Sequence, residues 1–255
     1  MKIKTDVVSV ILPVHNAARF LPQCLESLKE QTYDNLQIIA IDDFSKDDSL
    51  KILRQFKKHF KKFEIYSNKK HYGLATCFNR ALKHAQGQFV AFMNPHDINA
   101  ISRFKRQVSF LQKHPKAVAV GTQYTNIDEN NKKLDRSNLP EDHEIIYDNM
   151  IQAGSFHPET VMINRVRLPK DLLYFKHNKY PFVFTEVFMK FFNFGFVANI
   201  THALYFHREG VKRYTRRSSK FNQVASMMKL WLNAKAYNDT APSLKAFFPQ
   251  LVKNI

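Results

Sequence analysis

Two apolar runs near the start of the chain decide the fold: Val7-Val-Ser-Val-Ile-Leu12, which stops at Pro13, and Gln37-Ile-Ile-Ala-Ile41, which stops at Asp42-Asp43. Both are short and rich in β-branched residues, which is typical of buried strands. Apolar residues recur at helical spacing between them, at Phe20, Leu21, Cys24, Leu25 and Leu28. The stretch therefore predicts a strand, a helix and a second strand, the unit from which parallel sheets are built.

The same alternation continues to about residue 121. Further strand-like runs are separated by helical patterns, at Phe63–Tyr66, Gln88–Met93 and Ala117–Val120. This order predicts an α/β fold with a mostly parallel sheet, helices on both of its faces and a Rossmann-like N-terminal half. Beyond residue 144 we expect a strand at Thr160–Ile163, a helix at Glu186–Phe194 and a pair of strands within Phe196–Phe206.

The composition narrows the class of partner. The 255 residues carry a formal net charge of +17, a field that attracts nucleic acid, anionic lipid headgroups or a phosphorylated substrate. The sequence has neither zinc-finger spacing nor an aromatic ribonucleoprotein motif, so we expect no specific nucleic acid partner. A solvated basic face, resting on an anionic membrane surface in one interpretation, is the simpler explanation.

Cys24 and Cys77 lie within helical patterns and have no metal-ligand spacing, which predicts buried thiols. We find no cleavable leader pattern and no apolar run near the roughly 20 residues that span a bilayer. These features predict a cytoplasmic protein, either free or peripheral at the inner face of the membrane.

Polar residues follow three of the expected strands. They are Pro13-Val-His15-Asn16, Asp42-Asp43-Phe-Ser45 and Asn94-Pro-His-Asp97. In open α/β sheets ligands bind beyond the carboxyl ends of the strands, so these segments predict one shared site. The chain lacks the glycine-rich loops that cradle phosphates with backbone groups. A phosphate would therefore need a metal or basic side chains, and Lys70 is one candidate.

Several motifs, in order, resemble the family 2 glycosyltransferases of the GT-A fold. They are Val8-Ser-Val-Ile-Leu-Pro-Val-His-Asn16, Leu25-x-Ser27 with Gln31-Thr32, Ile41-Asp-Asp-x-Ser-x-Asp47, Gly73-Leu-Ala75, and Arg103 with Gln107. The resemblance is strong over residues 7–121 and weak over 155–207. It implies a GT-A domain at 1–210, with a nucleotide-sugar-binding half at 1–121 and an acceptor-side half at 122–210. A basic helical tail would follow at 211–255.

The resemblance implies inverting transfer of a sugar from a nucleoside diphosphate donor, often a UDP-sugar, to a hydroxyl of a sugar, a lipid-linked sugar or a protein. Pro13, His15 and Asp43 would line the nucleoside pocket, where Asp43 would accept a hydrogen bond from the base. The other residues expected to bind the donor are Asn16, Asp42, Lys70, Asn94 and Asp97. From capping preference alone, Asp42-Asp43 is equally well explained as a turn-forming pair before a helix.

The family's metal motif, Asp-x-Asp, is altered here, because the matching positions hold Asn94, His96 and Asp97. Mg²⁺ and Mn²⁺ prefer oxygen ligands, and Mn²⁺ accepts an imidazole more readily than Mg²⁺ does. If a divalent metal is used, we expect Mn²⁺ at His96 and Asp97. Two alternatives stay open: basic side chains replace the metal, or only binding is retained. Asn94 is also typical of a turn ahead of Pro95.

The family commonly has an acidic pair at the start of a helix after the sheet, and Thr185-Glu186 is the matching spot. Glu186 is therefore the candidate general base; a first-turn position favoured by the helix dipole is the alternative. His157 resembles the acceptor-facing segment, and His207-Arg208 the element near the diphosphate. For His157 a structural role beside Pro158 is the alternative, and for Arg208 a solvated basic loop.

Two other functions compete with transfer. A nucleotide-sugar-binding module or partner subunit without catalysis would explain the departures at positions 94, 96 and 185. A sugar-phosphate nucleotidyltransferase is less favoured, because Pro13-Val-His-Asn-Ala17 lacks the glycine-rich basic loop of that class. The C-terminal stretch at 218–237 has a helical apolar stripe, which indicates core packing or a membrane surface.

Overall fold

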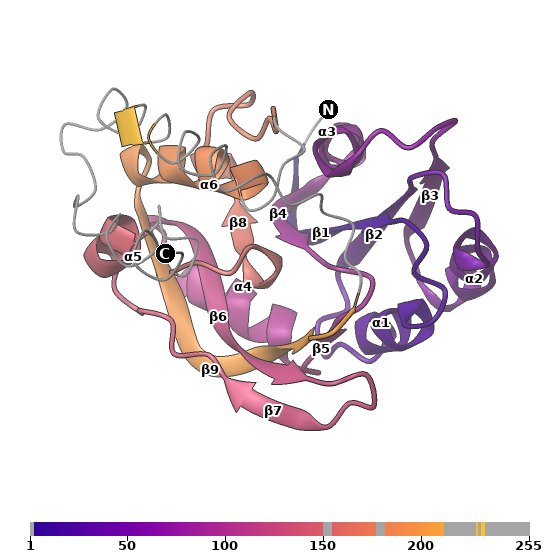
Figure 1. The fold of residues 1–255 in the computed structure, drawn as a ribbon. Helices are drawn as coiled ribbons and strands as arrows, with labels where there is room; N and C mark the ends of the chain where they lie inside the picture. The colour runs from indigo at the N-terminus through magenta and orange to yellow at the C-terminus, as the bar shows by residue number, and fades with distance from the viewer. Residues whose placement is uncertain (1–2, 150–154, 177–181, 212–227, 229–230, 233–255) are drawn as a thin grey trace.

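The computed structural model describes residues 3–149, 155–176, 182–211, 228 and 231–232 (Figure 1). The predicted basic helical tail at 211–255 falls almost wholly outside these residues. None of the helices in the described ranges has the length and apolarity needed to cross a membrane.

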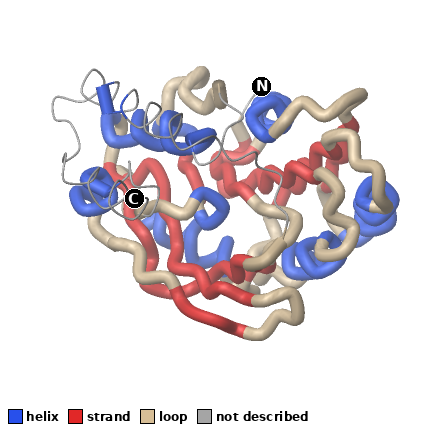
Figure 2. The backbone as a smooth tube through the Cα atoms, in the orientation of Figure 1, coloured by secondary structure: helices blue, strands red, loops and turns tan. Residues whose placement is uncertain are grey.

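One sheet organises the chain, with the strand order β3-β2-β1-β4-β8-β6-β9-β5 and with β7 added beside β6. The strands are β1 (Lys4–Val14), β2 (Leu36–Asp42), β3 (Phe63–Ser67), β4 (Gly87–Phe92), β5 (Ile98–Asn99), β6 (Ala117–Ile127), β7 (Lys133–Arg136), β8 (Met162–Asn164) and β9 (Phe196–Arg208). Figure 2 shows these strands between flanking helices. The predicted α/β architecture is confirmed.

The parallel half of the sheet is the half that the apolar runs predict. Strand β1 pairs in parallel with β2 and with β4, and β2 pairs in parallel with β3. The three carboxyl ends, at Val14, Asp42 and Phe92, consequently lie along one edge of the sheet. This edge, with the loops that follow the strands, is called the carboxyl rim below.

The second half is mixed, because β8 is antiparallel to both β4 and β6 whereas β9 is parallel to β6. The expectation of two strands within Phe196–Phe206 is wrong. Strand β9 is one strand of 13 residues, and shifts in its register with β6 replace the expected break. One long strand carries Tyr205, His207 and Arg208 to the carboxyl rim.

Helices cover both faces of the sheet (Figure 1). One face, called the α1 face, packs against α1 (Leu21–Lys29), α2 (Ser49–Phe56) and α4 (Arg103–Lys113). The other, called the α3 face, packs against α3 (Leu74–His84), α5 (His143–Asn149) and α6 (Phe182–Met189). Alternation along β1 explains the division, since Val8, Val10 and Leu12 belong to the α1-face core and Ile11 to the α3-face core.

Within the described residues, short 3₁₀ turns connect some of these elements: η1 (Lys57–His59), η3 (Pro158–Thr160), η4 (Arg165–Arg167) and η5 (Lys190–Asn193). Helix α6 begins at Phe182, four residues before the expected start at Glu186, and η5 follows it directly. Glu186 is therefore not in the first turn of its helix. The predicted burial of Cys24 and Cys77 is confirmed, and both carry thiols rather than a disulfide.

Candidate active site

Asp43 anchors the first corner of the carboxyl rim. Its side chain is fully buried and accepts hydrogen bonds from the side-chain amide of Asn68 and from the backbone N–H groups of Tyr72 (3.0 Å) and Gly73 (2.8 Å). His71 Nδ1 lies 3.3 Å from Asp43 Oδ2. Asp43 therefore fixes the loop between β3 and α3, and it does so with the carboxylate expected to contact a base.

His15 and Asn16 close this corner from the end of β1. The Nδ1 atom of His15 lies 2.8 Å from the carbonyl oxygen of Asp43, and the rings of His15 and His71 lie 4.3 Å apart. Asn16 accepts a hydrogen bond from the backbone N–H of Lys46 (2.7 Å) and adopts φ +48°. The loops after β1 and β2 are thus joined by direct hydrogen bonds.

The remaining predicted donor residues take different positions. Pro13 is a buried strand residue opposite Ile41, and its expected contact with the donor stays a prediction. Asp42 is buried, and its Oδ1 atom has no hydrogen-bond partner among the described residues. Lys70 is exposed and places its Nζ atom 5.3 Å from the ring centre of Tyr72.

The segment Asn94–Asp97 forms a tight turn after β4. The side-chain oxygen of Asn94 accepts a hydrogen bond from the backbone N–H of His96 (3.1 Å), and its carbonyl accepts one from the N–H of Asp97 (3.2 Å). These are the bonds of an Asx turn, in which an asparagine side chain replaces a backbone acceptor. The turn role that we considered for Asn94 is therefore present in the structure.

Asp97 joins this turn to the end of β9. It is fully buried and accepts hydrogen bonds from the Tyr205 hydroxyl (2.9 Å) and the backbone N–H of Arg208 (2.9 Å). Burial, assisted by the charge of Asp97, raises the pKa of the Tyr205 phenol well above its ordinary value. The phenol consequently stays protonated and remains a donor to the carboxylate.

Arg208 occupies the centre of the framework beneath the rim. The guanidinium is fully buried and donates to the carbonyls of His96 (2.9 Å) and Asp128 (2.7 Å) and to the side chain of Asn131 (2.6 Å). The central carbon of the guanidinium, Cζ, lies 4.4 Å from the ring centre of Phe20. The structure thus uses Arg208 to hold the turn after β4 and the loop between β6 and β7 against the end of β9. Its expected contact with a phosphate stays a prediction.

His157 and His207 come together with Asp97, although the three are far apart in the sequence. His207 Nδ1 lies 3.5 Å from Asp97 Oδ2, and the rings of His157 and His207 meet edge to face at 4.9 Å. His157 Nε2 lies 3.4 Å from Glu159 Oε2, and its ring packs 4.4 Å from that of Tyr124. The acceptor-side and diphosphate-side histidines therefore share one cluster.

Arg103 supports this cluster from α4. The guanidinium is fully buried and donates to Asn99 Oδ1 (2.6 Å) and to the carbonyl of Glu159 (2.6 Å). Burial lowers the pKa of Arg103 to about 10, which still leaves it charged at neutral pH. Gln107, one turn later, donates to the carbonyls of Val120 and Thr160, each at 2.8 Å. The Arg103-x-x-x-Gln107 motif therefore positions the segment that carries His157.

Glu186 lies in a different environment. Its Oε1 atom is 3.7 Å from Lys190 Nζ and 3.9 Å from Lys176 Nζ. Helix α6 packs into the α3-face core. The structure thus brings Asp97, His157 and His207 together and places Glu186 beside Lys176 and Lys190.

The residues at the altered motif do not form a metal centre in this arrangement. Asn94 and Asp97 direct their side-chain oxygens to backbone and tyrosine donors, and the Asp97 carboxylate is fully buried. Within the described part of the chain, no group of three or more His, Cys, Asp or Glu side chains is arranged to hold a metal ion. We therefore derive no step through a metal.

Sequence reasoning missed His71, Tyr72 and Tyr205. His71 and Tyr72 stand directly before the motif Gly73-Leu-Ala75, and that position was the available signal. Tyr205 is 108 residues from Asp97 in the sequence, and no local pattern predicts that contact.

Comparison with known proteins agrees with this geometry. The family model for glycosyl transferase family 2 matches residues 9–214. A putative glycosyltransferase of Bacillus subtilis (strain 168), EpsE, is 30% identical over 97% of this chain and 91% of its own length. The putative teichuronic acid biosynthesis glycosyltransferase TuaG of the same organism is 29% identical over 62% of each chain.

The fold has close counterparts among solved structures. The crystal structure of S. aureus TarS 1–349 in complex with UDP-GlcNAc aligns with a TM-score of 0.73 at 20% identity, covering 89% of this chain and 67% of that one. The likeness confirms the predicted GT-A-type architecture. With the family model matching most of its length, the chain belongs to glycosyltransferase family 2.

Proposed function

We propose that this glycosyltransferase moves a hexose from a UDP-sugar to an acceptor hydroxyl, with inversion at the anomeric carbon, in the assembly of a surface polysaccharide. One observation carries the proposal. Loops from the ends of β1, β2, β4 and β9 meet at the carboxyl rim, where α/β sheets bind ligands. Two similar proteins support the choice of donor and product: TarS, which was crystallised in complex with UDP-GlcNAc, and TuaG, which is named as a putative teichuronic acid biosynthesis glycosyltransferase.

The proposed donor pocket is the corner made by His15, Asp43 and His71. Asp43 already orders this corner through backbone N–H groups, so a nucleoside enters a preformed site rather than a mobile one. His207, whose Nδ1 lies 3.5 Å from Asp97 Oδ2, would contact the diphosphate through Nε2. Arg208 acts from beneath by holding the turn that carries Asp97.

Glu186 is the proposed base. It would accept the proton of the acceptor hydroxyl while that oxygen bonds to the anomeric carbon and the nucleoside diphosphate leaves from the opposite face. The alternative candidate for the base is Glu159, whose carboxylate lies beside His157 in the cluster around Asp97.

The test is transfer from a panel of UDP-, GDP- and dTDP-sugars, with the anomeric configuration of the product read by NMR. We expect Glu186→Gln to lose most of kcat while donor KM changes little, and Glu159→Gln to stay active. The opposite pattern would move the base to the His157–Glu159 pair. UDP binding by calorimetry without turnover of any donor would instead show a binding module.

Metal use is tested in the same assay. The sequence predicts Mn²⁺ in preference to Mg²⁺ at His96 and Asp97. In the structure the Asp97 carboxylate accepts hydrogen bonds from Tyr205 and Arg208, and the His96 ring packs edge to face against Phe20. Activity lost in EDTA and restored by Mn²⁺ would support the metal prediction. Full activity in EDTA would show that the diphosphate is stabilised by protein groups alone.

A further inference from the structure

Two adjoining hollows lie on the α3 face, away from the carboxyl rim. One, of about 520 Å³, is lined by α3, the segment 170–176 and Lys190. The other, of about 440 Å³, is lined by Ile3, the end of α3 and the segment 165–170. They share Leu82, Lys83, Lys170 and Leu173, so they form one groove, called the basic groove below.

The second hollow lies at the opposite end of the sheet from the corner made by His15, Asp43 and His71, called the donor corner below. The first hollow reaches Lys176 and Lys190, which also lie beside Glu186. Helix α3 runs back from the carboxyl rim, and its last turn carries Lys83. Ile3 and Ala85 line the second hollow, and they flank the first paired residues of β1 and β4, Lys4 and Gly87. The basic groove is therefore a second region, separate from the donor corner.

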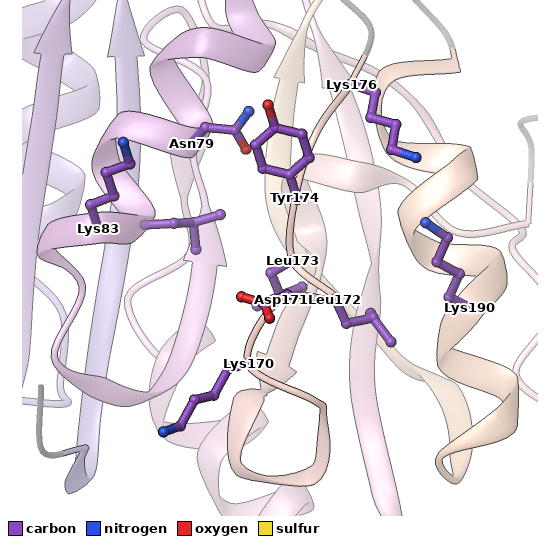
Figure 3. A pocket seen from close by; sticks show the side chains of 10 residues that line it. Asn79, Lys83, Lys170, Asp171, Leu172, Leu173, Tyr174, Lys176 and Lys190 are labelled. Carbon is purple, nitrogen blue, oxygen red and sulfur yellow. The ribbon is translucent and has the colours of Figure 1, made fainter.

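Its charge is strongly positive. Five cationic side chains line the two hollows, against one carboxylate, that of Asp171, among the described residues: Lys83, Arg165, Lys170, Lys176 and Lys190. Figure 3 shows Lys83 on one side of the first hollow and Lys176 with Lys190 on the other. Even with Glu186 beside the last two lysines, positive charge dominates. Such a field selects an anionic ligand.

Hydrogen bonds and aromatic packing hold the walls of the basic groove in place. Asn79 on α3 donates to the carbonyl of Phe175 (2.7 Å) and accepts from its N–H (2.9 Å), which ties the segment 170–176 to the helix. Phe175 itself is buried against Phe78, with ring centres 4.9 Å apart. In the second hollow Arg165 donates to the carbonyl of Ala85 (2.9 Å). These contacts hold the walls in place before a ligand arrives.

The walls also suit a sugar chain. Leucine side chains line the groove, and Tyr174 is 56% exposed between the lysines (Figure 3). Exposed aromatic rings pack against apolar faces, such as the C–H faces of sugars, while a polar group stays in water. The volumes lie within the roughly 300–1,000 Å³ of small-molecule sites. A flat bilayer surface would contact protruding side chains rather than the interior of a groove.

We propose that the basic groove binds an anionic saccharide chain, which holds the growing acceptor or product of the transfer proposed above. Lysines would pair with its carboxylates or phosphates, and Tyr174 with the leucines would contact its sugar rings. The proposal depends on the proposed function for its biological meaning, but the binding itself can be measured without any turnover.

The experiment measures binding of a fluorescein-labelled oligogalacturonate to the full chain by fluorescence polarisation, with a neutral malto-oligosaccharide of equal length as the comparison. We expect the acidic chain to bind, the neutral one to bind far more weakly, and added NaCl to weaken the acidic complex. Lys83→Gln/Lys170→Gln should raise its Kd roughly threefold to tenfold, the range for two exposed ion pairs. Tyr174→Ala should raise it as well.

The matched control is Lys51→Gln/Lys57→Gln, which removes the same charge from exposed positions on α2 and η1. If both double variants weakened binding of the acidic saccharide equally, the effect would come from overall charge, and the proposal of a binding groove would be wrong. Competition by inorganic phosphate alone at equal anion concentration would also overturn it, as would binding of phosphatidylglycerol vesicles through Lys83 and Lys170 without saccharide binding. Donor hydrolysis is measured in parallel, so that a failure of the proposed function is seen separately.

Discussion

The carboxylate of Asp97 joins the turn after β4 to the end of β9. Both of its oxygens accept hydrogen bonds from buried donors, the Tyr205 hydroxyl and the Arg208 backbone N–H. Asp97, which we expect to take part in the site, therefore also holds the surrounding backbone in place. A substitution that keeps its shape but changes one oxygen to a donor tests how much the rim depends on it.

Asp97→Asn should lower the free energy of unfolding by about 2–3 kcal/mol, because its amide would face one buried donor without an acceptor. Tyr205→Phe removes only the hydroxyl and should cost about 1 kcal/mol. Urea unfolding of both variants measures the difference. If the two variants were equally stable, the carboxylate would not be the acceptor that organises the turn.

Phe44 adopts φ +63° directly after Asp43, and 37% of its surface is exposed. A left-handed backbone costs a non-glycine residue about 1–2 kcal/mol. Such strain beside a candidate pocket suggests that the ring serves the donor, since strained residues cluster at functional sites.

Phe44→Gly should therefore raise the free energy of unfolding by about 0.5–1 kcal/mol, after the lost contact with Lys46 is allowed for. It should also raise donor KM. Phe44→Ala keeps the strain and removes the ring, so it separates the two effects. If donor KM were unchanged in both variants, the strained backbone at Phe44 would have no role in donor binding.

At the scale of elements, Gly87 shows how closely β1 and β4 approach. A Cβ atom there would lie 2.3 Å from the carbonyl oxygen of Val7, a backbone atom that cannot rotate away. Gly87→Ala should therefore destabilise the protein by about 2–3 kcal/mol. Gly210→Ala is the control, because a Cβ there meets nothing within 4 Å and only its φ of +75° opposes the change. Thermal unfolding of both should show the larger loss at Gly87.

Helix α5 is attached to β9 through His143, whose Nδ1 accepts a hydrogen bond from the Val197 N–H (3.2 Å). Burial lowers the pKa of His143 below its ordinary 6.5, with Glu144 opposing in part. The folded state thus binds the proton less tightly than the unfolded state. This contribution to stability is complete above the unfolded pKa and is lost as the pH falls below it.

We therefore expect Tm to fall by about 1–3 °C between about pH 7.5 and 5.5 through this group, which is partly exposed. In His143→Gln the same interval should give a flatter profile. Identical slopes for the two proteins would mean that another group governs this pH range.

The elements of the parallel half could be predicted because each is a local pattern. The apolar run of β1 and the helical spacing of α1 need no distant partner to be recognised. Strand β9 could not be read as one strand, because it continues through shifts in register that only its pairing with β6 sustains. The start of α6 was likewise missed, because Phe182–Met189 is apolar except at Thr185 and Glu186 and gives no clear face.

The sequence predicted which residues belong to the candidate site better than it predicted which of them contact one another. Asp97, His157 and His207 were each expected near the donor or acceptor, and the structure gathers them. The partners of Asp43 in the loop at 68–73 were not foreseen, because the path of that loop depends on how α3 docks on the sheet.

For the whole molecule, the donor corner and the second hollow of the basic groove lie at opposite ends of one sheet. Positive charge spread over the chain, +17 in total, gives both the donor corner and the groove an attraction for anions. They differ in construction, since Asp43 orders the donor corner through buried hydrogen bonds whereas exposed lysines line the groove. The two sites have no lining residue in common, so substitutions in them should act independently.

The prediction that follows combines the two sites. In transfer to an acidic saccharide acceptor, Asp43→Asn should raise donor KM, because it weakens the hydrogen bonds that order His71 to Gly73. Lys83→Gln/Lys170→Gln should raise acceptor KM and leave donor KM alone. The triple variant should show the product of the two effects, within about a factor of two, and added salt should affect chiefly acceptor KM. A triple variant whose loss departs strongly from that product would show that the sheet couples acceptor binding to the donor corner.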